Sequence, residues 1–197
     1  MNIKVVTAPT LSFVSLADAK TFLRMGDITV DDTLIQDCID DAQDYVEHDT
    51  GRTLLSTQYT YSIDTMEIII ELPRYPVQDV TKVEQLQNDG TYVVLNEAQW
   101  WLSDVEGGYV TPQLYWPVVS YTHIVNDVLR LTFDAGHTSI SDIPGALRRA
   151  ALYKMADFYT QRTSIPTIDG RYPRGMKPQD YDLAYSDAVQ SFRRINV

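Results

Sequence analysis

The chain has 197 residues, of which 44% are apolar and 22% are charged, a composition typical of a soluble globular protein with one domain and room for a small second module. Sixteen Lys and Arg residues face 27 Asp and Glu residues, and the net charge of −11 argues against a protein that wraps nucleic-acid phosphates. We expect no membrane span and no export, because no apolar run approaches about 20 residues and the first residues lack the pattern of a signal peptide.

The first part of the chain predicts two helices. Ser15 and Asp18 have the spacing of a capping box, and a short helix should follow to about Arg24. A second helix should begin at Asp31 or Asp32, and Gly51 suits a left-handed C-cap. The apolar positions of this second helix follow at steps of three and four and form one stripe: Leu34, Ile35, Cys38, Ile39, Ala42, Tyr45 and Val46.

The region of the second helix is strongly acidic. Between Asp27 and Thr50 there are nine acidic side chains and no Lys or Arg. Carboxylates near the end of a helix oppose the helix dipole, so the excess either has an outside reason or is a solvated face.

From Ser56 to Gly136 the apolar period changes to two, which predicts six or seven antiparallel strands. The segments 58–63 and 67–72 look like paired strands, and Asn88-Asp89-Gly90 predicts a hairpin turn. Further strands are expected at 77–83, 91–95, 107–110 and 128–133.

The last part of the chain predicts two more helices. Pro144 suits the first turn of a helix that ends near Arg162, and a final helix should run from about Asp180 to Arg194. The stretch 163–179 between them contains three prolines and two glycines, and it is either a linker or an arm that orders against a partner. Residues 145–197 carry 9 basic and 5 acidic groups, against 7 and 22 before them, and such a division favours ordered contacts with partners or other copies.

This order of elements indicates an α+β fold, in which a small helical bundle carries an inserted antiparallel β subdomain. The first two helices are too short to be stable alone and should pack on the third. We expect N-terminal helices in 1–55, the β subdomain in 56–140, the third helix in 141–163, and an extended arm with a C-terminal helix in 164–197.

No motif for catalysis, cofactors or metals is present. HExxH, GxGxxG, P-loop, GxSxG and CxxC patterns are absent, and the three histidines lie far apart. Cys38 lies in the apolar stripe as a small core side chain, and one cysteine permits no internal disulfide. We expect no cofactor, no metal site and no enzymatic activity.

Aromatic side chains crowd one stretch of the β region, where Trp100, Trp101 and Trp116 lie near Tyr109 and Tyr115. They either fill a small β core or form an interface or a sugar-stacking platform. Adjacent strand residues face opposite sides, so Trp100 and Trp101 cannot both point inward. A carbohydrate- or receptor-binding module that uses these three tryptophans is therefore one functional alternative.

Short segments follow in a fixed order along the chain: LADAK (16–20), YVE (45–47), TGRTL (50–54), LPRYPV (72–77), LTFDAG (131–136) and YTQR (159–162). With these segments the chain from Leu16 to Arg162 resembles the head–tail connector, or adaptor, proteins of long-tailed double-stranded DNA bacteriophages. Such chains often end soon after the third helix, whereas this one continues to Val197.

The resemblance implies a structural virion protein that forms a ring of about twelve copies below the portal and extends the DNA channel. It implies the portal, the stopper or tail-completion protein and other copies of the chain as partners, and DNA that passes without sequence-specific binding. The protein should be part of the head–tail neck and assemble in the host cytoplasm. A stopper or tail-completion protein of the same neck is the alternative within the virion.

A ring needs two different faces of each subunit to meet, and an acidic lumen repels DNA phosphates. We expect an acidic surface that faces the channel or a neighbour, formed by Asp37, Asp40, Asp41, Asp44 and Glu47. We expect docking on the portal or on an adjacent copy through Arg171, Tyr172, Arg174, Lys177, Arg193 and Arg194.

Overall fold

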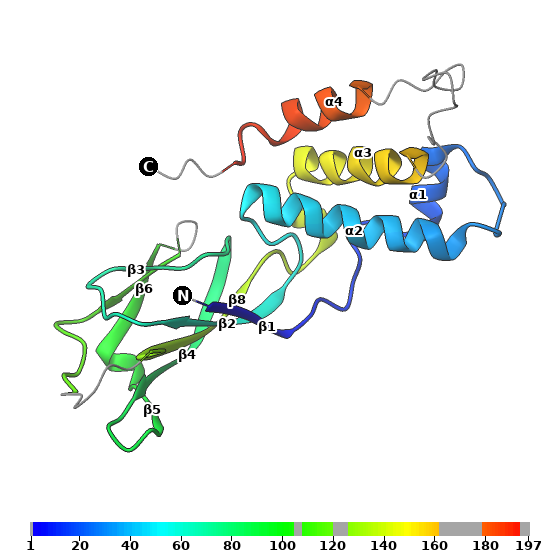
Figure 1. Ribbon diagram of the computed structural model, residues 1–197. Coiled ribbons are helices and arrows are strands. Elements are labelled where there is room, and N and C mark those ends of the chain that lie inside the picture. Colours follow the sequence, from blue (N-terminus) through cyan, green and yellow to red (C-terminus); the bar gives the residue numbers. More distant parts are fainter. Residues whose placement is uncertain (1, 105–107, 120–125, 162–178, 194–197) are drawn as a thin grey trace, which may run out of the picture. The chain divides into compact units, whose positions relative to one another are not determined.

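The computed structural model describes residues 2–104, 108–119, 126–161 and 179–193 (Figure 1). The chain forms two compact units, a β unit of Met1–Thr10 with Leu55–Thr138 and a helical unit of Leu11–Leu54 with Ser139–Val197. The strands are β1 (Asn2–Thr7), β2 (Thr57–Ile63), β3 (Ile70–Glu71), β4 (Val77–Leu86), β5 (Tyr92–Val94), β6 (Trp100–Asp104), β7 (Tyr109–Pro112) and β8 (Leu129–Ala135). The helices are α1 (Leu16–Leu23), α2 (Asp32–Thr50), α3 (Gly145–Gln161) and α4 (Gln179–Val189), with short 3-10 turns at Glu97–Gln99 and Ile140–Asp142. The α+β class predicted from sequence is confirmed.

The β unit contains two antiparallel sheets. The larger sheet has the strand order β1-β2-β8-β4-β5, and the smaller one has the order β3-β7-β6. The central strand β8 pairs with β2 on one side and β4 on the other, so that Phe133 lies opposite both Tyr59 and Val80. The last strand in sequence therefore joins the two halves of the larger sheet.

The apolar period of two decides which side of the larger sheet is buried. Along β8, Leu129, Leu131 and Phe133 are buried, whereas Arg130 and Thr132 between them are half-buried on the other face. One hydrophobic core contains residues of both sheets, among them Ile70 of β3, Val83 of β4, Trp100 of β6 and Val110 of β7. The alternation read in the sequence is thus confirmed as the source of the core.

Two turns of the β unit depend on glycine. The hairpin predicted at Asn88-Asp89-Gly90 joins β4 to β5, and Asp89 accepts hydrogen bonds from the N–H and hydroxyl of Thr91 at 2.9 and 2.7 Å. Gly108 has φ +64°, and a Cβ added there would lie 2.7 Å from Val77 Cγ2. Only glycine meets both conditions at position 108.

Three expectations for the β region are wrong. Residues 1–10, assigned to the helical part within 1–55, contain β1, which pairs with β2 and belongs to the β unit. The segments 58–63 and 67–72 do not pair with each other, because β2 already has β1 and β8 as neighbours and β3 pairs with β7. The described residues form eight strands rather than six or seven.

In the helical unit, α3 packs against α1, α2 and α4, and Figure 1 shows α2, α3 and α4 side by side. The predicted packing of the first two helices on the third is confirmed. Gly51 is the left-handed C-cap of α2 at φ +67°, and the Ser15 side chain accepts the N–H of Asp18 at the start of α1.

The helix details differ from expectation at several positions. Asp31 is the N-cap residue of α2, but its carboxylate accepts a hydrogen bond from the Tyr159 hydroxyl at 2.8 Å instead of capping the backbone. Tyr45, expected in the apolar stripe of the second helix, is exposed, because it lies at the border of that stripe. The regular part of α4 ends at Val189, five residues before the predicted end.

Candidate assembly surfaces

The outward face of α2 carries carboxylates. Asp37, Asp41 and Asp44 follow at steps of four and three and are exposed, and Asp40 beside them is exposed as well. Ile35, Ile39 and other apolar side chains are buried on the opposite face of the helix. The apolar stripe therefore determines which side of α2 is covered and leaves the acidic side on the surface.

Glu47, the fifth residue of the predicted acidic surface, forms hydrogen bonds within the helical unit. Its Oε1 atom accepts the backbone N–H of Leu54 at 2.9 Å and the side-chain amide of Gln43 at 3.2 Å. It is half-buried and ties the chain after α2 back onto the helix. The exposed acidic surface, as the structure shows it, consists of Asp37, Asp40, Asp41 and Asp44.

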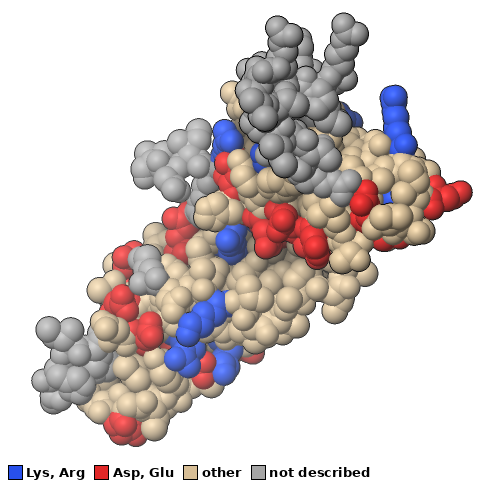
Figure 2. All heavy atoms as spheres, turned by 45° about the vertical axis from the view of Figure 1, so that its right-hand side comes forward, with Lys and Arg blue, Asp and Glu red and all other residues tan. Residues whose placement is uncertain are grey.

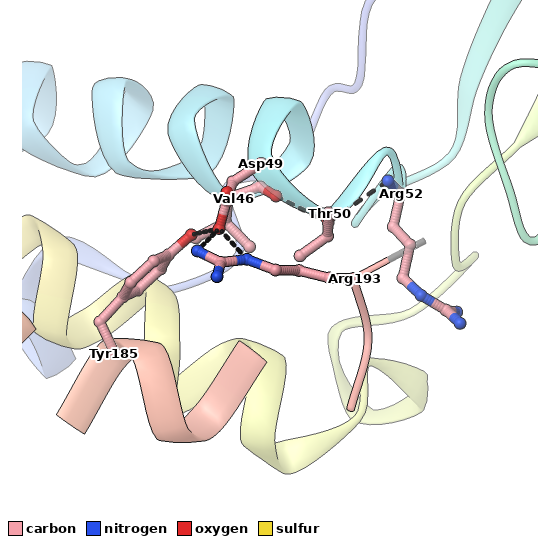
Figure 3. A network of polar contacts seen from close by, with 6 residues as sticks. All are labelled: Val46, Asp49, Thr50, Arg52, Tyr185 and Arg193. Atoms are coloured by element: carbon pink, nitrogen blue, oxygen red, sulfur yellow. Dashed lines mark hydrogen bonds and ion pairs between the residues drawn. The ribbon is translucent and has the colours of Figure 1, made fainter. Parts of the chain in front are cut away.

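A polar network fastens the C-terminal part of the helical unit to α2 (Figure 3). Asp49 Oδ2 accepts the Tyr185 hydroxyl at 2.6 Å and both Nε and an Nη of Arg193 at 3.1 and 2.9 Å. Burial, followed by the hydrogen bond to Asp49, raises the pKa of the Tyr185 hydroxyl well above its ordinary value. One carboxylate therefore holds two groups that come from the last described part of the chain.

A buried ion pair lies on α3. Lys154 Nζ is 3.1 Å from Asp157 Oδ2, and both residues are buried. The Lys154 ammonium also lies over the rings of Tyr45, Phe158 and Tyr185, at 4.5, 5.3 and 5.8 Å from their centroids. Cation–π contacts of this kind strengthen where water is excluded. Lys154 thus links side chains of α2, α3 and α4.

The six residues predicted for docking have different outcomes. Arg193 forms an ion pair with Asp49 of the same chain, so its guanidinium already has a partner inside the helical unit. Arg171, Tyr172, Arg174, Lys177 and Arg194 lie outside the described residues. The sequence shows that Arg193 is basic but not that Asp49 is its partner, and no local signal marks the network of Asp49, Tyr185 and Arg193.

The β unit has a polar hollow on the outer face of its larger sheet, with a volume of about 760 Å³. Lys4, Lys82 and Arg130 line it together with Glu84, and the only other basic residue in the sequence of the β unit is Arg74. Figure 2 shows Lys and Arg atoms gathered on the strand-bearing part of the molecule. Lys82 pairs with Glu84 at 2.9 Å and Arg130 lies 4.0 Å from the Tyr92 ring centroid, so neighbours within the sheet contact two of the three cations.

The three tryptophans do not form a joint surface. Trp100 and Trp116 belong to the buried core, whereas Trp101 is exposed, as the strand alternation of the pair predicts. The Trp116 indole N–H donates to the carbonyl of Glu67 at 2.7 Å. The platform required by the carbohydrate-binding alternative is therefore absent at these residues.

The described ranges offer neither a metal site nor a membrane-spanning helix. They contain no group of three or more His, Cys, Asp or Glu side chains arranged to hold a metal ion. None of the helices there combines the length and apolar character that a membrane crossing requires. Cys38 is buried in the stripe of α2, as predicted.

Comparison with solved structures identifies the fold. Three solved chains have TM-scores of 0.76, 0.75 and 0.73 and identities of 20%, 20% and 19%; each match covers 100% of this chain and 97% of the other. Their structures are a virion of a native gene transfer agent particle, the neck of an empty particle computed with C6 symmetry, and the neck of a native particle computed with C12 symmetry. No curated protein matches the chain.

The sequence itself matches a described family over part of its length. Residues 13–106 match the family of phage gp6-like head-tail connector proteins, and this region includes α1, α2 and much of the β unit. The resemblance drawn from short segments of the sequence, and with it the expected role of a structural virion protein, is supported by this match of residues 13–106 to the phage gp6-like head-tail connector proteins.

Proposed function

We propose that the chain is an adaptor subunit of the virion neck, which assembles into a ring between the portal and the stopper or tail-completion protein. The family match over residues 13–106 is the observation that carries this proposal. The similarity of the whole fold to chains of gene transfer agent particles supports it. The role is structural rather than catalytic, and no cofactor takes part.

The proposed ring contains twelve copies, each in contact with two neighbours. The neck of a native particle, in which a chain of similar fold occurs, was computed with C12 symmetry. In a cyclic ring, one face of each subunit meets a different face of the next, so the two contact faces need not resemble each other. A chain with two separate units offers different surfaces for such contacts.

The acidic face of α2 lines the channel or its rim in this proposal. Asp37, Asp41 and Asp44 are exposed along one side of the helix. Packaged DNA carries a dense row of phosphate charges, so an acidic wall repels it and allows it to slide without adhering. Arg171, Tyr172, Arg174, Lys177 and Arg194 are assigned to docking on the portal, while Arg193 acts within the subunit.

Native mass spectrometry of the chain mixed with the portal oligomer of the same virus tests the proposal. We expect a saturating complex with about one chain per portal subunit. Absence of a complex, with both proteins folded, would assign the chain to the stopper layer or overturn the neck assignment.

The charge-reversal variant Arg171→Glu/Arg174→Glu tests the docking residues in the same assay. We expect it to lose portal binding while its circular dichroism spectrum remains that of the wild type. The matched control is Arg148→Glu/Arg149→Glu, which reverses two exposed charges on α3. Equal loss in both variants would show that general charge, rather than these positions, drives docking.

A further inference from the structure

Two loops of the β unit expose a group of large apolar side chains, named here the apolar loop patch. Ile68 and Ile69 precede β3, and Leu114, Tyr115 and Val118 follow β7. Their exposed fractions are 76% and 56% for the isoleucines and 83%, 84% and 92% for the other three residues. Single exposed apolar residues are common, but a group at such exposure on neighbouring loops is typical of an interaction site.

Buried side chains beneath the patch tie the two loops together. The Trp116 indole N–H donates to the carbonyl of Glu67 at 2.7 Å, which joins the second loop to the first. The Gln85 side-chain amide, also buried, donates to the carbonyl of Pro117 at 2.7 Å. These bonds point the backbone carbonyls inward and hold the loops in place, so the apolar side chains stay outside. A contact surface that is already ordered loses little entropy when it binds.

We propose that the apolar loop patch is the contact through which one copy of the chain packs on the next copy in the ring. This inference rests on the proposed function, which requires a copy-to-copy interface. Permanent interfaces between identical subunits are more apolar than transient contacts, so an exposed apolar group that is already ordered fits a copy-to-copy interface. The neighbour supplies a different face, as a head-to-tail ring demands.

The two charged surfaces, the acidic face of α2 and the hollow of the larger sheet, are less suited than the apolar loop patch to hold copies together. The acidic face of α2 consists of carboxylates, and most residues that line the hollow of the larger sheet have polar or charged side chains. Contacts of that kind steer association and respond to salt, whereas burial of Leu114, Tyr115 and Val118 removes apolar area from water and contributes free energy directly. The patch therefore provides adhesion between copies, and the acidic face of α2 remains free to line the channel.

The experiment places a charge in the patch and measures how copies fill the portal. In Val118→Asp and Leu114→Asp the new carboxylate lies at an exposed position, so the monomer should keep its unfolding midpoint in urea. The matched control is Val94→Asp, which puts the same charge on an exposed valine of β5 in the same unit. Each protein is added to the portal oligomer at less than saturating amounts and examined by native mass spectrometry.

We expect the wild type and Val94→Asp to fill portals cooperatively, so that empty and complete rings dominate. Val118→Asp and Leu114→Asp should give partly filled portals with a random distribution of copies. If both patch variants fill portals as the wild type does, the inference is wrong and the proposed function stands. If they lose portal binding entirely but still associate with one another, the patch contacts the portal, which also overturns the inference.

The proposed function can fail separately. A wild-type chain that binds no portal overturns that function, and sedimentation of the chain alone then decides the role of the patch. Self-association of the wild type that is lost in Val118→Asp and kept in Val94→Asp supports a copy-to-copy contact. Equal sedimentation of all three proteins rejects it.

Discussion

The two units of the chain are stabilised in different ways. The core of the β unit is built from alternating apolar side chains of its two sheets, such as Leu131 and Phe133. Among the described residues, the two charged side chains that are buried, Lys154 and Asp157, both lie on α3 of the helical unit. When a core side chain is shortened, the free energy of unfolding falls with the volume of the cavity left behind. When a buried charge loses its ion-pair partner, the cost of removing that charge from water is no longer offset by the ion pair. The helical unit should therefore respond most to single changes of charge, and the β unit to changes of shape.

The largest effect should come from breaking the buried pair on α3. Asp157→Ala leaves the Lys154 ammonium buried without its carboxylate, and we expect a loss of about 3 to 5 kcal/mol in the free energy of unfolding. The surface variant Asp41→Ala on α2 should change it by less than about 0.5 kcal/mol. Urea unfolding followed by circular dichroism measures both.

The double variant Lys154→Met/Asp157→Leu sharpens the interpretation. It replaces both charges with apolar groups of similar size and should recover most of the stability lost in Asp157→Ala. If the double variant is as unstable as Asp157→Ala, the loss in the free energy of unfolding arises from packing rather than from a buried charge without its partner. The proposed difference between the two units in their response to charge and to shape would then be wrong.

A change of shape should have its strongest effect in the β unit at Gly108. Gly108→Ala adds a Cβ at a left-handed position where Val77 Cγ2 lies only 2.7 Å away, and we expect a loss of about 3 kcal/mol. Gly90→Ala is the matched control, because Gly90 has φ +83° but no heavy atom within 4 Å of the added carbon. It should cost only about 1 to 2 kcal/mol. Equal losses would show that the backbone angle alone matters.

The smallest effect concerns Tyr185 and depends on pH. Tyr185→Phe removes the hydrogen bond to Asp49 and should cost about 1 kcal/mol at neutral pH. Burial and the bond to Asp49 raise the pKa of Tyr185 in the folded state, so the unfolded chain releases this proton at lower pH than the folded chain. The stabilising contribution is therefore complete below about pH 10 and is lost as the pH rises above that value.

Urea unfolding of the wild type and Tyr185→Phe between about pH 8 and pH 11 tests this dependence. The difference in stability between the two proteins should shrink at the alkaline end. A difference that stays constant over this range contradicts the assigned role of the hydroxyl proton. Other tyrosines titrate equally in both proteins and cancel in the comparison.

Patterns local in sequence were sufficient for much of the fold. The caps at Ser15 and Gly51 and the opposite orientation of Trp100 and Trp101 all follow from neighbouring residues, and the structure confirms them. Each depends on backbone geometry over a few residues, which side-chain type and spacing determine directly.

Features that depend on distant partners could not be predicted in this way. Val5 of β1 pairs with Tyr59, and residues 1–10 were assigned to the helical part within 1–55 because nothing near them shows that the distant strand β2 is their neighbour. Asp49 and Tyr185 are 136 positions apart, so nothing near either residue shows that they meet. For the same reason Arg193 was predicted to dock on a partner, although it pairs inside the chain.

The central place of β8 has a consequence for the order in which the newly made chain can fold. β2 and β4 leave the ribosome before the strand that joins them, because β8 ends only at Ala135. Until then both strands expose edges that can pair with other chains, and the helical unit likewise awaits α3. The β unit therefore cannot be completed before β8 is made, and the helical unit cannot be completed before α3, which follows soon after. Slow translation before β8 should thus promote aggregation through these unpaired strand edges.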